Sequence, residues 1–167
     1  SAVELIDQAF LAYNGRRLRE ACRLFANKML EPDVTVGITL AGALTPAGMG
    51  LSALAPLIEA GFIDWIVSTG ANLYHDAHRI IGHRIREIEP NAGDLQYRLS
   101  RIIRIYDLGF WEETLLETDK LFSAILRKPE FQKKMTGTEL RYLLGACFAA
   151  QEEHNRVPAG LLATCHR

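Results

Sequence analysis

The sequence predicts an α/β protein in which helices flank a parallel sheet, and three observations support this prediction. Two short apolar runs rich in β-branched residues, 34–40 and 63–67, have the composition of buried strands. The segment between them, 51–60, has a helical pattern that Pro56 kinks or restarts. This strand–helix–strand order makes the two strands parallel, with a right-handed crossover.

Amphipathic helices account for most of the remaining chain. Two are expected before the first strand, at 3–13 and 15–30, with the turn-type pair Asn14-Gly15 between them. After the second strand, helical patterns recur at 71–82, 94–104, 114–126, 136–153 and 159–166. Residues 106–109 should form a turn. Because two strands alone cannot form a stable sheet, we expect further structure to complete it.

The composition fits one globular domain and gives no sign of a nucleic-acid partner or a membrane span. The chain has 167 residues, of which 49% are hydrophobic, and a net charge of −1. No apolar run approaches the roughly 18 residues that cross a bilayer, and the N-terminus lacks a signal-peptide pattern. Cys22, Cys147 and Cys165 lie far apart without metal-binding spacing, which favours a reducing cytoplasm.

Three arginines, Arg98, Arg101 and Arg104, recur at a spacing of three. On a helix they would share one face, which we interpret as a solvated or interface face rather than a phosphate track. Tyr97 and Tyr106 lie among them, and stacking on a nucleic-acid base is possible in principle. The absence of net positive charge favours packing instead.

Both predicted strands run into small residues. The first is followed by "AGALTPAGMG", residues 41–50, and the second by "STGAN", residues 68–72. Ligands of open α/β sheets bind beyond the carboxyl ends of parallel strands, where small side chains admit a cofactor and a helix N-terminus favours phosphate. Neither loop is a GxGxxG motif or a P-loop, so tight turns and close strand–helix packing remain an alternative.

A titratable cluster, Tyr74, His75 and Asp76, follows the second loop. A histidine there could hold a polar ligand or move a proton, or it could be an ordinary surface or interface residue. His75 and His78 could face one another on a helix, but no third ligand follows at a convincing spacing, so no metal site is predicted. No GxSxG motif or Cys–His pair indicates nucleophilic catalysis.

The two loops together resemble a known family. "GITLAGALTPAGMG", residues 37–50, followed by "GFIDWIVSTGANLYHD", residues 61–76, is similar to deoxyhypusine synthase and its bacterial deoxyhypusine synthase-like relatives. The segments 14–25 and Arg104–Asp107 also resemble the bacterial branch. The likeness extends over nearly the whole chain, but only over the N-terminal half of the family's usual length.

The resemblance implies a Rossmann-like α/β domain, NAD as the cofactor and a homotetramer with sites at dimer interfaces. It also implies transfer of a 4-aminobutyl group from spermidine, through an imine on a lysine, to a protein lysine or, as in homospermidine synthesis, to a free diamine. The family's cofactor-binding loops match here Gly42, Ala43, Ala47, Thr69, Gly70 and Ala71. Tyr74 and His75 stand where eukaryotic members carry an acidic pair, and with Asp76 they are the expected substrate-binding residues.

The resemblance places the family's catalytic lysine in a later segment, so no catalytic residue is assigned in this chain. We therefore expect residues 1–167 to be the N-terminal half of a single NAD-binding domain that a complementary C-terminal polypeptide completes. The leading hypothesis is part of a cytoplasmic NAD-dependent aminobutyl transferase. The alternative is a non-catalytic paralogue that binds and regulates a catalytic sister subunit.

Overall fold

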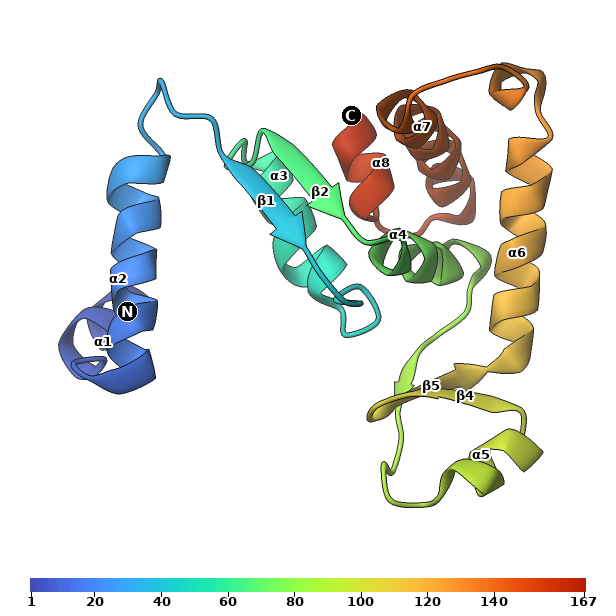
Figure 1. Cartoon of the computed structure of the whole chain (residues 1–167), viewed down its shortest axis with the longest axis horizontal. Coiled ribbons are helices and arrows are strands. Elements are labelled where there is room, and N and C mark those ends of the chain that lie inside the picture. Colours follow the sequence, from blue (N-terminus) through green and yellow to red (C-terminus); the bar gives the residue numbers. More distant parts are fainter.

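Helices alternate with two small sheets in a computed structural model that describes residues 1–167. Figure 1 shows the helical pair α1 and α2 at one side, the strands β1 and β2 in the middle, and the helices α4, α6, α7 and α8 packed at the other side. The mixed α/β class is therefore as predicted. No helix of the structure is long and apolar enough to span a membrane.

The first sheet confirms the predicted parallel pair. Strand β1 (Gly37–Leu40) runs parallel to β2 (Trp65–Ser68), with Gly37 opposite Trp65. Both strands begin later than the sequence predicts, because the chain enters the sheet through a side-chain contact. The Val36 N–H donates to the Asp64 carboxylate at 2.7 Å, and the Asp64 N–H donates back to the Val36 carbonyl at 2.8 Å.

The predicted helix between these strands consists of two joined segments. The wide turn η2 (Gly50–Leu54) leads directly into α3 (Ala55–Glu59), and Pro56 lies in the first turn of α3. Pro56 has no N–H to donate to the preceding turn, so the change from η2 to α3 occurs beside it. Gly61, with φ +75°, follows the end of the helix in a left-handed conformation.

The N-terminal helices break elsewhere than predicted. α1 (Ala2–Ala9) and α2 (Tyr13–Leu24) are separated at residues 10–12, and Asn14-Gly15 belongs to the first turn of α2. Gly15 lies beside Phe10, where an added Cβ would make an ordinary contact of 3.4 Å with the Phe10 Cβ. The helix continues as η1 (Phe25–Met29), and no residue of α1, α2 or η1 is buried.

A second sheet replaces part of the helix predicted over 94–104. Only α5 (Asp94–Leu99) is helical there. The antiparallel strands lie in the order β3 (Arg86–Glu87), β5 (Leu108–Trp111), β4 (Ile102–Ile105). The turn expected at 106–109 is confined to Tyr106 and Asp107.

The three arginines consequently do not share a helical face. Arg98 lies in α5, Arg101 lies between the elements with φ +54°, and Arg104 lies in β4. The β-branched run from Ile102 to Ile105 pairs with β5 and overrides the three-residue spacing. The predicted face is therefore wrong.

The main core lies among the C-terminal helices. It is formed by α4 (Gly70–Ala77), η3 (His78–Ile81), α6 (Glu112–Leu126), η4 (Pro129–Phe131), α7 (Gly137–Asn155) and α8 (Leu161–His166). Their shared apolar cluster comprises Ala77, Ile80, Ile125, Phe131, Leu144, Phe148, Leu162 and Ala163. α7 begins at a side-chain cap, because the Thr136 hydroxyl accepts from the Glu139 N–H at 3.1 Å. A smaller cluster of Leu40, Leu54 and Leu161 joins β1 to α8.

Close approach of α7 and α8 depends on Gly145, and we predict that Gly145→Ala lowers the free energy of unfolding by about 1–3 kcal/mol. The added Cβ would lie 2.6 Å from the Leu162 carbonyl oxygen and 2.7 Å from the His166 Cβ, so backbone must move. Chemical denaturation measures the change. Gly70→Ala is the control, since its Cβ would meet no atom within 4 Å. Equal losses in both variants would contradict the prediction.

Candidate functional site

The loops after β1 and β2 are bound together by side-chain hydrogen bonds from both loops. The Thr69 hydroxyl donates to the Gly42 carbonyl at 2.6 Å and accepts from the Asn72 amide at 3.2 Å. The Asn72 side-chain oxygen accepts from the Leu44 N–H at 2.6 Å, and the Thr45 hydroxyl donates to the Asn72 carbonyl at 2.7 Å. These four bonds fix the two loops as one unit at the carboxyl ends of the parallel strands.

Asn72 is the residue of this unit that the sequence did not single out. It is fully buried. Its side-chain amide bonds Leu44 of the first loop and Thr69 of the second, and its backbone carbonyl accepts from the Thr45 hydroxyl. The only signal in the sequence is a polar amide in the first turn of a helix that follows a strand. That signal is weak, because asparagine is common near helix starts for local reasons.

The joined loops leave open space where a ligand could approach the backbone. A Cβ added at Gly42, Gly48 or Gly70 would meet no atom within 4 Å. Gly42 and Gly48 also have φ of +62° and +83°, which other residues rarely adopt. Thr69 is the N-cap residue of α4, but its side chain does not cap the helix, so the first N–H groups of α4 are free of a side-chain partner.

The expected cofactor residues are only partly brought together. Contacts join Thr69 to Gly42, and Gly70 begins α4 directly beside them. Ala43 and Ala71 are neighbours of these residues in the chain, half-buried and exposed respectively. Ala47 lies farther along the first loop, exposed in the turn over residues 45–48.

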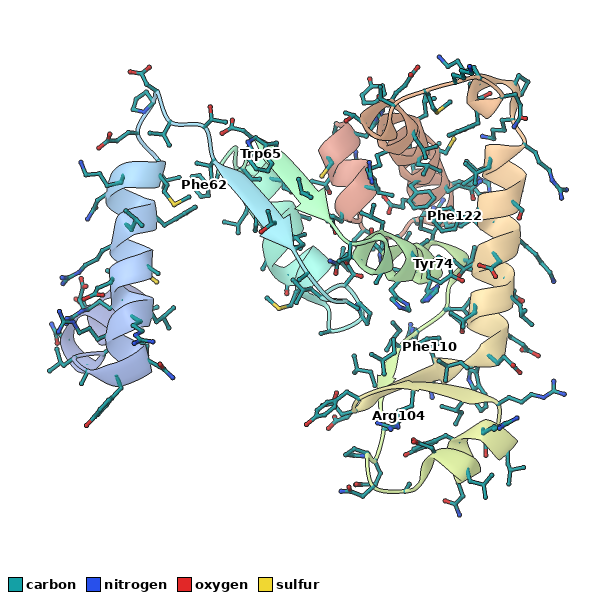
Figure 2. The ribbon with its side chains drawn as sticks, in the orientation of Figure 1. Phe62, Trp65, Tyr74, Arg104, Phe110 and Phe122 are labelled. Atoms are coloured by element: carbon teal, nitrogen blue, oxygen red, sulfur yellow. The ribbon has the colours of Figure 1, made fainter.

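Tyr74 packs against α6. Its hydroxyl donates to the Asp119 carboxylate at 2.7 Å, and its ring is stacked on Phe122 with centroids 5.7 Å apart. Figure 2 labels both residues where α4 approaches α6. Burial, followed by the hydrogen bond to Asp119, raises the pKa of Tyr74 well above its ordinary value. The phenol is therefore a neutral donor.

His75 and His78 form a hydrogen-bonded pair, as their spacing suggested. His75 Nδ1 lies 2.9 Å from His78 Nε2, and His78 Nδ1 lies 2.7 Å from the Thr118 hydroxyl. Burial lowers the pKa of His75. Burial, and then the neighbouring His75 and His83, lower the pKa of His78 to about 4. Both rings are therefore neutral near pH 7.

Asp76 is directed at α8. Its carboxylate is 5% exposed and accepts from the Leu161 N–H at 2.7 Å. Arg79 lies 3.8 Å from the same carboxylate and donates to Glu152 at 2.6 Å, and Glu152 also accepts from the Gly160 N–H at 2.9 Å. Burial raises the pKa of Asp76, and Arg79 opposes that shift. No group of three or more His, Cys, Asp or Glu side chains is arranged to hold a metal ion.

Comparison with known proteins confirms the resemblance seen in the sequence. A family model described as deoxyhypusine synthase matches residues 4–166. A protein of Cyanothece sp. named deoxyhypusine synthase-like protein is 49% identical over 167 residues, covering 99% of this chain and 42% of the relative. A relative of the same name from Nostoc punctiforme is also 49% identical over 167 residues, with 99% and 43% covered.

An archaeal relative is more distant. A probable deoxyhypusine synthase 2 of Methanosarcina mazei is 34% identical over 146 residues, covering 87% of this chain and 42% of the relative. The chain thus spans less than half the length of the curated relatives it matches.

The buried imidazole of His78 predicts a loss of stability in mild acid. The unfolded chain takes up this proton near pH 6.5, whereas the folded protein does so only near pH 4, so stability should fall as the pH drops between these values. His78 should contribute about 3 kcal/mol to that fall. Denaturation at several pH values measures it.

His78→Gln should flatten this part of the pH profile, whereas His154→Gln, on the exposed side of α7, should leave it unchanged. A profile that is the same for His78→Gln and the unchanged protein would show that this imidazole is not the titrating group.

Proposed function

The chain belongs to the deoxyhypusine synthase family, and from this premise we propose that it forms part of an NAD-dependent transferase that moves an aminobutyl group from spermidine or a related polyamine. The observation that carries the proposal is the joined pair of loops at the ends of β1 and β2, with open space beside their glycines. The acceptor would be a protein lysine or a free diamine.

NAD fits the chemistry of these loops. Its pyrophosphate requires backbone N–H groups and close approach of the chain, and α4 offers its uncapped N-terminus next to Gly42 and Gly70. We assign the cofactor-binding role to Gly42, Ala43, Ala47, Thr69, Gly70 and Ala71. Bound NAD would supply a hydride acceptor for oxidation of the polyamine. Thr69 would orient the first loop through the Gly42 carbonyl.

Tyr74, His75 and Asp76 remain the proposed contacts to the amine substrate. The Tyr74 hydroxyl and the Asp76 carboxylate already have partners within the chain. His75 is half-buried and has one ring nitrogen without a partner, so it is the member of the three best able to bind a ligand directly.

The outer edge of β2 is unpaired, which supports the proposal that a further strand extends the β1–β2 sheet. In a parallel pair, only every second residue of a strand bonds to a given neighbouring strand. The Thr69 N–H donates to the Leu40 carbonyl of β1, so odd-numbered residues here face β1. The backbone groups of Ile66 and Ser68 therefore point away from β1. Both line a groove of about 560 Å³ between β2 and the helices α7 and α8. Ten of the fifteen residues that line this β2 groove are hydrophobic.

We propose that a strand of a complementary C-terminal segment fills the β2 groove. Residues 1–167 would then be the N-terminal part of a single Rossmann-like domain, assembled as a homo- or hetero-oligomer, a tetramer of complete units. The three cysteines are free, which supports the proposed cytoplasmic location.

NAD binding tests the proposed function. In the complete protein, Gly70→Trp should weaken NAD binding at least tenfold, because the indole would fill the space beside the loops. Calorimetric titration with NAD gives the affinity. Glu113→Trp, on the exposed face of α6, is the control and should bind normally. Unchanged binding by a folded Gly70→Trp protein would reject the cofactor site. Normal NAD binding by the unchanged complete protein, without turnover of a polyamine, would favour the regulatory paralogue.

Amide hydrogen exchange tests the completion of the sheet. The N–H groups of Ile66 and Ser68 should exchange at least tenfold more slowly in the complete protein than in the 167-residue chain, because a new strand would accept their hydrogen bonds. The N–H of Val67 faces β1 and serves as the internal reference. If Ile66 and Ser68 exchange equally fast in both, no strand occupies the β2 groove.

A further inference from the structure

We infer that His75 presents a ring N–H donor at Nε2, because the buried Thr118 hydroxyl fixes the tautomers of His78 and His75 in sequence. This inference deepens the proposed function, on which its choice of ligand rests. The hydrogen bonds among Thr118, His78 and His75, here called the histidine relay, come from α6, η3 and α4 respectively.

Thr118 decides which group donates in each hydrogen bond of the relay. Its side chain is fully buried, and His78 Nδ1, at 2.7 Å, is its one hydrogen-bond partner. A buried hydroxyl whose hydrogen has no acceptor is disfavoured by about tenfold or more. The Thr118 hydroxyl therefore donates to His78 Nδ1.

His78 then carries its hydrogen on the other nitrogen. Since burial keeps this imidazole neutral near pH 7, it has a single N–H, which must lie at Nε2. His78 Nε2 donates to His75 Nδ1 at 2.9 Å. His75 is also neutral and accepts at Nδ1, so its own hydrogen lies at Nε2, the nitrogen without a partner in the chain.

The groups around the relay offer no competing partner. Asp119 of α6 is bound by the Tyr74 hydroxyl at 2.7 Å. His83 pairs with Glu117 at 2.6 Å. The other neighbours are the aromatic rings of Tyr74 and Phe110, with centroids 5.6 and 5.9 Å from that of His75 and 5.2 and 5.4 Å from that of His78. Thr118 alone therefore decides which nitrogen of His78 and of His75 carries the hydrogen.

A fixed donor at His75 selects the kind of group that binds there. An N–H pairs with an acceptor, such as a neutral amine nitrogen or a carbonyl or carboxylate oxygen, whereas an ammonium group has donors only. An ammonium group would reverse the relay and leave the Thr118 hydrogen without a partner. This position should thus take an uncharged nitrogen or an oxygen of the substrate and disfavour a cation.

Nitrogen NMR of the histidine rings tests the relay without NAD or substrate. The chain has five histidines, so His75→Gln and His78→Gln assign the two signals. We expect His75 to carry its hydrogen at Nε2, and Thr118→Val to convert His75 and His78 to mixed tautomers. Thr114→Val is the matched control, because Thr114 is equally buried on α6 and its hydroxyl has no partner. Its spectrum should match that of the unchanged protein.

A His75 hydrogen at Nδ1, or an equal effect of Thr114→Val, would overturn the relay. Spermidine binding to the complete protein near pH 7 then tests the ligand choice. Thr118→Val should bind this cation about fivefold or more tighter, because His75 is free to accept. If Thr118→Val alters the tautomers but binds spermidine with the same affinity as the unchanged protein, His75 does not select against a cation. Absence of spermidine binding in both proteins would instead contradict the proposed function and leave the NMR result standing.

Discussion

The arrangement of the helices depends on one buried ionic network at the N-terminus of α8. Asp76 and Glu152 are 5% and 1% exposed, and they share Arg79 while accepting the N–H groups of Leu161 and Gly160. Loss of a single member would leave a buried charge uncompensated, which costs far more than the net contribution of the pair. Because α4 follows β2 directly, this network also sets the direction in which the second loop leaves the sheet.

The same network changes what the cluster after the second loop can do. Asp76 would be an attractive ligand for a cationic amine, but its carboxylate is already bound to α8 and Arg79. Tyr74 is similarly bound to Asp119. Two of the three candidate substrate residues thus stabilise the fold, and His75 between them keeps a free ring nitrogen. The chemistry of this position is therefore that of a neutral imidazole rather than a carboxylate.

The sequence predicts those features whose causes are local. Runs of β-branched residues indicated the parallel strands, and helical periodicity indicated α6 and α7. The second sheet was missed because Arg98, Arg101 and Arg104 imitate helical spacing. The site contacts of Asn72, Thr118 and Asp76 join residues 28, 40 and 85 positions apart, respectively. No local pattern encodes such pairings. The small residues after each strand and the resemblance to a family pointed to these loops, but not to the contacts that join them.

Apolar side chains are buried in the helical part of the chain but remain exposed along β2. Around α4, α7 and α8 the apolar side chains are buried in one cluster. At β2, Trp65 and Val67 remain 49% and 59% exposed beside the open edge. Exposed apolar side chains along an unpaired strand favour association with another strand. The loops after β1 and β2 lie between these regions, so the helical core can hold them in place before the β2 groove is filled.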